Sequence, residues 1–426
     1  MTRGSPLPPA GNNGKEELLI MEGQRPLEGI KILDFTIYVA ASVGSSVFGY
    51  LGADVVKIEP PKGDPWRQFG NGFRLPVSEE ENPCFDAINC FKRDIVLNLR
   101  DPEGMAAMHR LIERADILIT NYRGSALKSM GLTYEDVRKI NPRIVYATND
   151  GYGRLGPDAA RPGFDTAAFW ARSGLARAQA YSDQPPCTSA AAAGDIIASM
   201  GFTTGVLAAY IQAKATGVGC EIYTSLFSTA LWVGSVNAVL NQYIPNYGSV
   251  YGKPAFLAIA MDYICSDGNW IRLSGQNADR YWPDFCKALG LEEYENDPRF
   301  NTSVAQCANA TACFDLIDSK IRQKPLSEWI GILNAHDLPF ELVNTGATAA
   351  RDEQAIANGY VETIDYPQGG ETYVTMPPMR ISGSTPPKRE KAAKKGQHTA
   401  EVLREYGFSD EEIRRLIERG AAEQHA

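Results

Sequence analysis

Three aspartates fall within one glycine-rich stretch of the chain: Asp165 in RPGFD, Asp183 in YSDQPP and Asp195 in SAAAAGDIIASM. A carboxylate can act as an acid, a base or a nucleophile. The stretch follows an apolar run at residues 144–147 that is typical of a buried strand. Ligands of open α/β sheets bind beyond the carboxyl ends of strands, so we expect a site here.

Asp195 is the strongest of the three candidates because it opens an apolar helix after a run of small residues. Its local sequence is typical of a helix N-cap. The same position also suits a nucleophile, since the helix dipole and free amides would keep the carboxylate ionised. Small neighbours would let a bulky substrate approach. Asp165 and Asp183 stand beside glycine or proline, which is more typical of turns.

Alternating strand and helix patterns around these residues predict an α/β fold. Strands are expected at 30–35, 54–59, 94–99, 116–119 and 144–147, with helices at 39–51, 134–140 and 195–216. This indicates a Rossmann-like, doubly wound large domain. The first strand lacks the G-x-G-x-x-G turn that follows it in dinucleotide-dependent oxidoreductases, which disfavours that class.

We expect three regions along the chain. Residues 1–25 form a disordered leader, 26–220 with 345–426 form the large domain, and 225–340 form a small α+β domain. A hairpin is predicted to turn at residues 266–268. The basic run at 388–395 is interpreted as a solvated linker before a terminal helix.

Composition limits the function classes. The net charge of −9 disfavours nucleic-acid binding, and neither a membrane span nor a secretory signal is evident. The eight cysteines form no Cys-x-x-Cys pair and the four histidines are scattered, so we expect reduced thiols, no metal and a cytoplasmic enzyme.

Five blocks of the sequence, in order, resemble the class III coenzyme A-transferases, the family of formyl-CoA transferase and carnitine CoA-transferase. They are PLEGIKILDFT…LGADVVKIEPPKGDPWR, NCFKRDIVLNLRDPEG, ADILITNYRGSALKSMGL, INPRIVYATNDGYG and TGVGCEIYTSL. The resemblance implies that coenzyme A passes from an acyl-CoA to a free carboxylic acid, with no further cofactor. It also implies an interlocked homodimer, in which each ring-like chain threads the other.

The resemblance carries roles to individual positions. Asp195 matches the covalent nucleophile, which would form an aspartyl anhydride and then an aspartyl–CoA thioester. Pro60 and Ser129 stand where the family has basic residues. The neighbouring Lys128 is the candidate substitute for the second, and Arg123, Lys92 and Arg93 are further candidates for the missing charge. Three of the coenzyme A contacts named below have a simpler alternative interpretation: Arg100 as a surface charge, Tyr122 as a residue that packs under a loop, and Asn121 as a turn residue. The positions that match coenzyme A contacts are Val39, Ala40, Leu97, Arg100, Asn121, Tyr122, Arg123, Lys128 and Arg161.

Within the family, PGFDTAAFWARSG and SEEENPCFDAIN are similar to the 2-hydroxy-acid branch. This implies an acceptor such as an aryllactate or 2-hydroxyisocaproate, and a 2-hydroxyacyl-CoA dehydratase as pathway partner. Asp165, Phe169 and Trp170 would line the pocket for the acid. The alternative is that the two aromatic residues belong to the core. The family's mobile glycine run is missing from residues 249–263, so shielding of the intermediate is expected from elsewhere.

Other functions stay open at this point. The related α-methylacyl-CoA racemases abstract a proton with a histidine of a G-H-D block, where this chain has Phe164. Transfer between other acids, of the formyl/oxalyl or carnitine type, is a second alternative. A binding protein with a decayed site is a third, which the intact G-D block disfavours.

Overall fold

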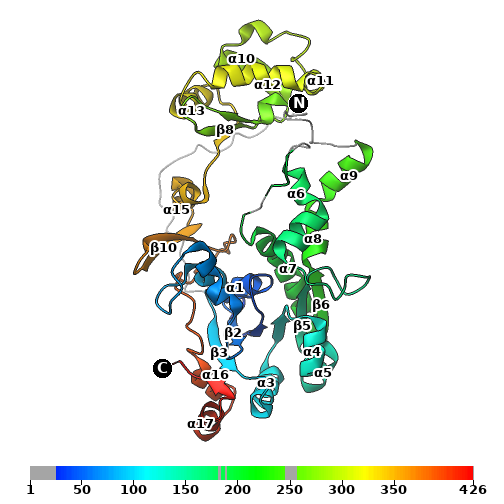
Figure 1. Ribbon diagram of the computed structural model, residues 1–426, viewed down its shortest axis with the longest axis vertical. Helices are drawn as coiled ribbons and strands as arrows, with labels where there is room; N and C mark the ends of the chain where they lie inside the picture. Colours follow the sequence, from blue (N-terminus) through cyan, green and yellow to red (C-terminus); the bar gives the residue numbers. More distant parts are fainter. Residues whose placement is uncertain (1–24, 181–183, 188–189, 245–256, 426) are drawn as a thin grey trace, which may run out of the picture.

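The computed structural model describes residues 25–180, 184–187, 190–244 and 257–425. The predicted leader, apart from Arg25, and the candidate Asp183 lie outside this part. Figure 1 shows a large sheet with its helices and, beyond α9, a second group that contains β8, α10, α12 and α13.

The main sheet has the strand order β12-β3-β2-β1-β4-β5-β6. Strands β1 to β6 run parallel and β12 pairs antiparallel with β3. The order 3-2-1-4-5-6 is that of a Rossmann-type sheet, whose ligands bind where the order reverses, between β1 and β4. The predicted α/β class is confirmed. The strands are β1 Lys31–Phe35, β2 Asp54–Glu59, β3 Arg93–Leu97, β4 Ile117–Thr120, β5 Val145–Asp150, β6 Cys220–Ser225 and β12 Ala422–Glu423.

Helices cover both faces of this sheet, as apolar residues on both sides of each strand require. On one face, Ile32 and Val145 share a core with Phe202 of α7. On the other, Leu33 and Tyr146 pack with Leu111 of α3 and with residues of the C-terminal helices. The helices on the two faces are α1 Ser42–Tyr50 and α7 Ala193–Thr216, then α3 Pro102–Arg114, α5 Tyr134–Ile140, α16 Thr399–Glu405 and α17 Asp410–Glu418.

Helix α7 is long and apolar enough, by length and composition, to cross a membrane, and 39% of its most apolar window is buried. In this fold it packs along α1, β5 and β6 instead. Small residues allow the close approach: a Cβ at Gly205 would lie 2.9 Å from Ile222 Cδ1 of β6. Its apolar character is therefore that of a helix covering a sheet.

A second core lies entirely within residues 257–338 and is built around Trp282, Phe285 and Trp329. Its sheet has the antiparallel order β7-β8-β9, and the chain turns near the predicted residues 266–268. The elements are η3 Ala258–Ala260, β7 Asp262–Ile264, β8 Trp270–Leu273, α10 Ala278–Leu289, η4 Glu292–Tyr294, α11 Ser303–Ala308, α12 Ala310–Ile321, α13 Leu326–Ala335 and β9 Phe340–Leu342.

The boundary predicted at residue 225 is too early. Leu226 and Ala230 of α8 share a buried cluster with Ala198 and Phe169, so α8 packs on the large sheet's helices rather than on the second core. The remaining elements are η1 Pro65–Phe73, α2 Pro83–Asn89, α4 Gly124–Met130, η2 Asp165–Ala171, α6 Leu175–Ala178, α8 Leu226–Val233, α9 Ser235–Tyr243, α14 Gly346–Ala349, α15 Glu353–Ala357, β10 Val361–Tyr366 and β11 Gly370–Thr375.

The basic run at 388–395 is only partly a solvated linker. Arg389 is 4% exposed, and its Nη2 donates a hydrogen bond of 3.0 Å to the Asp86 carbonyl. Lys395 Nζ donates to the Pro61 carbonyl at 2.7 Å. The run fastens the C-terminal segment to α2 and to the loop after β2, a role that its charge pattern does not reveal.

Candidate active site

Asp195 is the third residue of α7, which begins at Ala193 after the cap residue Ala192. The expected N-cap role is therefore wrong. The cap is supplied from 30 residues earlier, because Asp195 N donates a hydrogen bond of 3.1 Å to Asp165 Oδ1. Asp165 also accepts from the Gly194 amide, so a residue that resembled a turn aspartate holds the first turn of α7.

Gly194 is required by this packing. A Cβ there would lie 2.1 Å from Asp165 Oδ1 and 2.6 Å from Phe169 Cγ. Phe169 is fully buried in the cluster under the helix start, which fits the alternative that it is a core residue rather than one that lines the acid pocket. Burial raises the pKa of Asp165, and the half-buried Trp170 beside it opposes that rise only weakly, because its indole N–H completes no hydrogen bond of good geometry.

A serine that the sequence analysis missed joins α7 to the loop after β1. Ser199 Oγ donates to the Asp195 carbonyl at 2.8 Å and accepts from the Ala41 amide at 3.0 Å. Ser199 lies four residues after Asp195 on the same helix, so its spacing was the available signal. The contact brings the nucleophile candidate to the position between β1 and β4, where the strand order reverses.

The backbone around Asp195 is strained at three positions. Tyr38, Ala41 and Ala192 have φ values of 59°, 67° and 59°, which L-residues rarely adopt. The helix predicted from residue 39 consequently begins only at Ser42. Strain of this kind persists where surrounding contacts enforce it, and it gathers at functional sites.

The pKa of Asp195 is higher than expected for a carboxylate at the start of a helix. Burial raises the pKa of Asp195 to about 7, and the negative charge of Asp165 adds to the rise. The amides of Gly194 and Asp195, which were expected to stabilise the Asp195 carboxylate, are bonded to Asp165 instead. A pKa of about 7 runs against the prediction that the helix dipole and free amides keep this group ionised, and it makes Asp195 a comparatively basic carboxylate.

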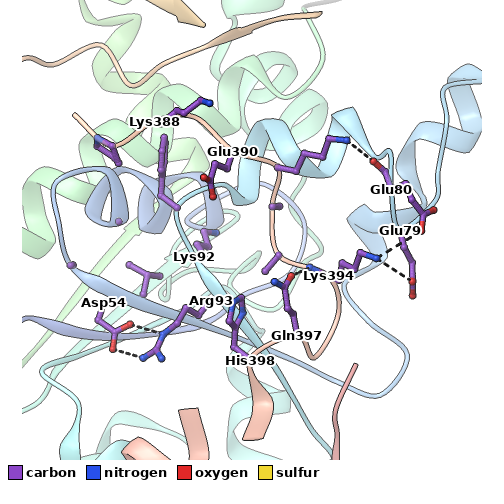
Figure 2. A pocket seen from close by; sticks show the side chains of 18 of the residues that line it. Asp54, Glu79, Glu80, Lys92, Arg93, Lys388, Glu390, Lys394, Gln397 and His398 are labelled. Atoms are coloured by element: carbon purple, nitrogen blue, oxygen red, sulfur yellow. Dashed lines mark hydrogen bonds and ion pairs between the residues drawn. The ribbon is translucent and has the colours of Figure 1, made fainter. Parts of the chain in front are cut away.

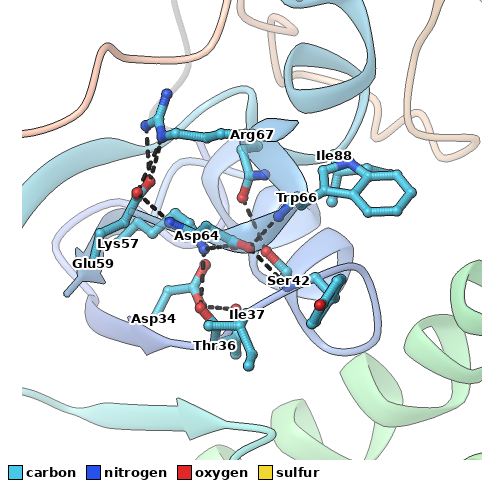
Figure 3. Close-up of polar contacts among 12 residues, drawn as sticks. Asp34, Thr36, Ile37, Ser42, Lys57, Glu59, Asp64, Trp66, Arg67 and Ile88 are labelled. Atoms are coloured by element: carbon cyan, nitrogen blue, oxygen red, sulfur yellow. Dashed lines mark hydrogen bonds and ion pairs between the residues drawn. The ribbon is translucent and has the colours of Figure 1, made fainter. Parts of the chain in front are cut away.

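Buried charges hold the loop after β1 in place (Figure 3). Lys57 Nζ lies 2.9 Å from Asp64 Oδ2 and donates to the Thr36 carbonyl at 3.1 Å. Asp64 in turn accepts from the Tyr38 amide at 3.0 Å. Burial alone would lower the pKa of Lys57, but Asp64 and Asp34 outweigh it and hold the pKa above its ordinary value.

Asn121 also braces this loop. Its Nδ2 donates to the carbonyls of Ile37 and Ala40 at 2.6 and 2.8 Å, and its Oδ1 accepts from the Ile37 amide at 3.0 Å. Asn121 is thus more than a turn residue, and its amide is engaged with the loop. Val39 is 1% exposed and so offers a ligand almost no surface, whereas Ala40 is half-buried.

The other expected coenzyme A contacts lie along the C-terminal edge of the parallel strands. Tyr122 stacks on Phe35 with ring centroids 4.4 Å apart and lines a pocket of about 280 Å³ with Arg154. Leu97 ends β3 and is 1% exposed, so its side chain belongs to the core. The charged members are exposed and follow β3, β4 and β5 in turn: Arg100, Arg123 and Lys128, and Arg161.

A wide cleft of about 960 Å³ opens elsewhere (Figure 2). Asp54 and Arg93, the first residues of β2 and β3, line it with Lys388 and Lys394. Because the strands are parallel, this is the N-terminal edge of the sheet, opposite the edge that carries Asp195. Arg93 is already paired with Asp54 at 2.8 Å. We therefore place the candidate reaction at the other edge.

No histidine accompanies Asp195 in the described chain. Phe164, at the position of the racemase histidine, is 57% exposed and its ring meets that of Tyr38 at 6.3 Å. The four histidines lie on α3, at the end of α13, before α16 and near the C-terminus.

Comparison with known proteins identifies the family. The family model "CoA-transferase family III" matches residues 27–399. The chain belongs to CoA-transferase family III. The (R)-2-hydroxy-4-methylpentanoate CoA-transferase of Clostridioides difficile is 32% identical over 387 residues, spanning 91% of this chain and 97% of that protein. The cinnamoyl-CoA:phenyllactate CoA-transferase of Clostridium sporogenes is also 32% identical, over 91% and 95%.

Solved structures agree with this assignment. A CAIB/BAIF family protein from Brucella suis superimposes with a TM-score of 0.78 at 29% identity, covering 90% of this chain and all of that one. A Mycobacterium tuberculosis protein has a TM-score of 0.75 at 22% identity, over 89% and 99%, which shows the shared fold. This family III chain is therefore a CoA-transferase of Rossmann-like architecture, and the expected family is confirmed.

Proposed function

We propose that this enzyme transfers coenzyme A from an acyl-CoA to a free 2-hydroxy acid, with Asp195 as the covalent nucleophile. The observation that carries the proposal is the place of Asp195: a half-buried carboxylate in the first turn of α7, linked through Ser199 to the loop after β1. The two relatives at 32% identity are named for 2-hydroxy-4-methylpentanoate and phenyllactate, which supports this class of acceptor.

The proposed reaction begins when the Asp195 carboxylate attacks the thioester carbonyl carbon. The carbon–sulfur bond breaks, giving a mixed anhydride and coenzyme A thiolate. The thiolate attacks the aspartyl carbonyl, releases the first acid and leaves an aspartyl–CoA thioester. The incoming carboxylate then displaces the thiolate, which attacks the new acyl carbonyl and restores Asp195. Thioester energy is conserved throughout, so the proposed cycle needs no metal or second cofactor.

Coenzyme A is proposed to lie along the C-terminal edge of the strands. Arg100, Arg123 and Arg161 are exposed there and suit its phosphates. Where the resemblance implies a basic residue but the chain has Pro60, the fold brings Lys395 to the carbonyl of the next residue, Pro61, at 2.7 Å. Lys395, whose Nζ is also paired with Glu423 Oε2 at 2.8 Å, is our candidate for the missing charge once that pair opens.

We also propose that a second copy of this chain covers the exposed apolar surface of α8 and α9, as the interlocked dimer implied by the resemblance requires. Trp232 is 80% and Tyr243 83% exposed, and such a concentration of bare apolar side chains is typical of an interface. The exposed apolar side chains of α8 and α9 are Leu231, Trp232, Val233, Val236, Val239 and Tyr243. We further propose that the enzyme acts in the cytoplasm. Its pathway partner would be a dehydratase that consumes the 2-hydroxyacyl-CoA product.

The decisive experiment is exchange between cinnamoyl-CoA and phenyllactate by the full-length enzyme and by Asp195→Asn. We expect kcat of the variant to fall roughly 1,000-fold or more, because the amide of Asn cannot attack the thioester and the covalent route is lost. Hydroxylamine added to enzyme and acyl-CoA should inactivate the wild type and leave a hydroxamate on the Asp195 peptide. Full exchange by Asp195→Asn would overturn the assignment, and deuterium wash-in at the α-carbon would favour the racemase.

A further inference from the structure

The two acids at the start of α7 are arranged asymmetrically. The carboxylate of Asp165 receives the amides of Gly194 and Asp195, whereas the Asp195 carboxylate receives no hydrogen bond from the described residues. Amides that point at a carboxylate stabilise its charged form. Burial raises the pKa of Asp165 above its ordinary value, and the two amides oppose that rise. Asp195 has no such donors among the described residues, so Asp165 is the better stabilised anion of the two.

Packing fixes this arrangement. Asp165 is 9% exposed at the start of η2, and Phe169 of the same element is fully buried under α7. Both side chains can approach the helix start only because residue 194 is glycine: a Cβ there would lie 2.1 Å from Asp165 Oδ1 and 2.6 Å from Phe169 Cγ. The acid cannot move away without unpacking the helix start.

We propose that Asp165 is a positioning residue for the nucleophile: its carboxylate anchors the first turn of α7 and places a fixed negative charge beside Asp195. The proposal rests on Asp195 being the nucleophile. It replaces the expected role of Asp165 as a residue that lines the acid pocket.

The surroundings single out Asp165 as the source of that charge. Toward the helix start, the loop after β1 presents Ala41, α7 itself presents Ser199, and α8 presents the apolar Leu226 and Ala230. Among the described residues, Asp165 is the charged group whose field acts on Asp195. Its charge opposes ionisation of Asp195, which keeps the carboxylate basic and so more nucleophilic once ionised.

Asp165→Asn separates the anchor from the charge, because the amide oxygen still accepts hydrogen bonds. In the full-length enzyme we expect the acidic limb of the kcat/KM profile to move about one pH unit lower. Asp165→Ala removes both functions, and we expect at least roughly a 100-fold loss at every pH. The matched control is Asp352→Asn, which removes a charge from an exposed carboxylate that also caps a helix through two amides. Its profile should match the wild type.

A second measurement needs neither turnover nor a folded variant. Carbodiimide labels protonated carboxyl groups, so peptide mass spectrometry can follow labelling of wild-type Asp195 against pH. We expect half-maximal labelling near pH 7. A wild-type labelling midpoint near 4, or an Asp165→Asn kcat/KM profile that superimposes on that of the wild type, would overturn the inference. Exchange activity retained by Asp195→Asn would instead refute the proposed function, and the labelling result would still stand.

Discussion

Gly194 and Phe169 approach so closely that no side chain fits between them: a Cβ on Gly194 would lie 2.6 Å from Phe169 Cγ. The residue before the nucleophile candidate is thus fixed by the packing beneath it. The G-D block is a structural unit in which the glycine admits Phe169 and Asp165, and those two residues orient the aspartate.

Gly194→Ala should therefore disturb the site. We expect a loss of about 1–3 kcal/mol in unfolding free energy, because overpacking displaces the helix start, together with a large fall in kcat. Gly201→Ala is the control on the same helix, where a Cβ meets Thr229 Cγ2 at an ordinary 3.8 Å. It should stabilise the protein by roughly 0.5 kcal/mol. Urea unfolding and exchange assays measure both; equal behaviour of the two variants would contradict the packing argument.

Ser199→Ala should separate α7 from the loop after β1, since the hydroxyl bonds Ala41 and Asp195 together. We expect kcat to fall about tenfold through misplacement of the carboxylate, with little change in the KM for acyl-CoA. Thr204→Ala removes a comparable bond from an exposed hydroxyl of α7 to the Met200 carbonyl and should leave both constants unchanged. A wild-type kcat for Ser199→Ala would show that this link is dispensable.

Asp195→Asn should stabilise the protein in a pH-dependent way. Because the folded pKa of Asp195 is raised to about 7, the folded state binds its proton more tightly than the unfolded state. Stability contributed by this group is complete at low pH and is lost as the pH rises from about 4 to about 7. The variant avoids that loss, so we expect a gain on the order of 2 kcal/mol at pH 8 that vanishes near pH 4. Urea titrations at the two pH values measure it, and a gain independent of pH would exclude this cause.

Lys92→Met tests the buried charges under the loop. Lys92 Nζ lies 2.8 Å from Asp34 Oδ2, with side chains 1% and 0% exposed. Removing the cation leaves Asp34 buried without it, which we expect to cost about 3–5 kcal/mol. The Arg272–Asp262 pair, 46% and 38% exposed, provides the control: Arg272→Met should cost less than about 1 kcal/mol. Chemical unfolding of both variants measures the loss of unfolding free energy. Similar losses in the two variants would refute the idea that the buried pair matters more than the exposed one.

Trp232→Glu tests the proposed second copy. A charge placed on the exposed apolar surface of α8 and α9 should weaken association at least roughly tenfold, as seen by sedimentation at several concentrations. Val304→Glu changes a side chain that is equally bare, at 82% exposure, but lies on α11 in the other core unit. We expect it to leave association unchanged. Wild-type association by Trp232→Glu would remove this surface from the interface.

The sequence by itself determined the parallel sheet, the helices between its strands and the candidacy of Asp195. These features depend on apolar spacing and capping over a few residues, which local pattern reports directly. Matching blocks in order also identified the family, because each block carries the loop that follows a strand.

Only the tertiary structure decided how Asp195 is held. Its cap comes from Asp165, its link to the β1 loop joins Ser199 to Ala41 across 158 residues, and Arg389 is buried by segments far away in the chain. Local pattern predicted an ionised N-cap at Asp195; burial and Asp165 produced a basic carboxylate inside the first turn. The physical reason is that hydrogen-bond partners and desolvation depend on which distant elements pack together, and no short-range spacing encodes them.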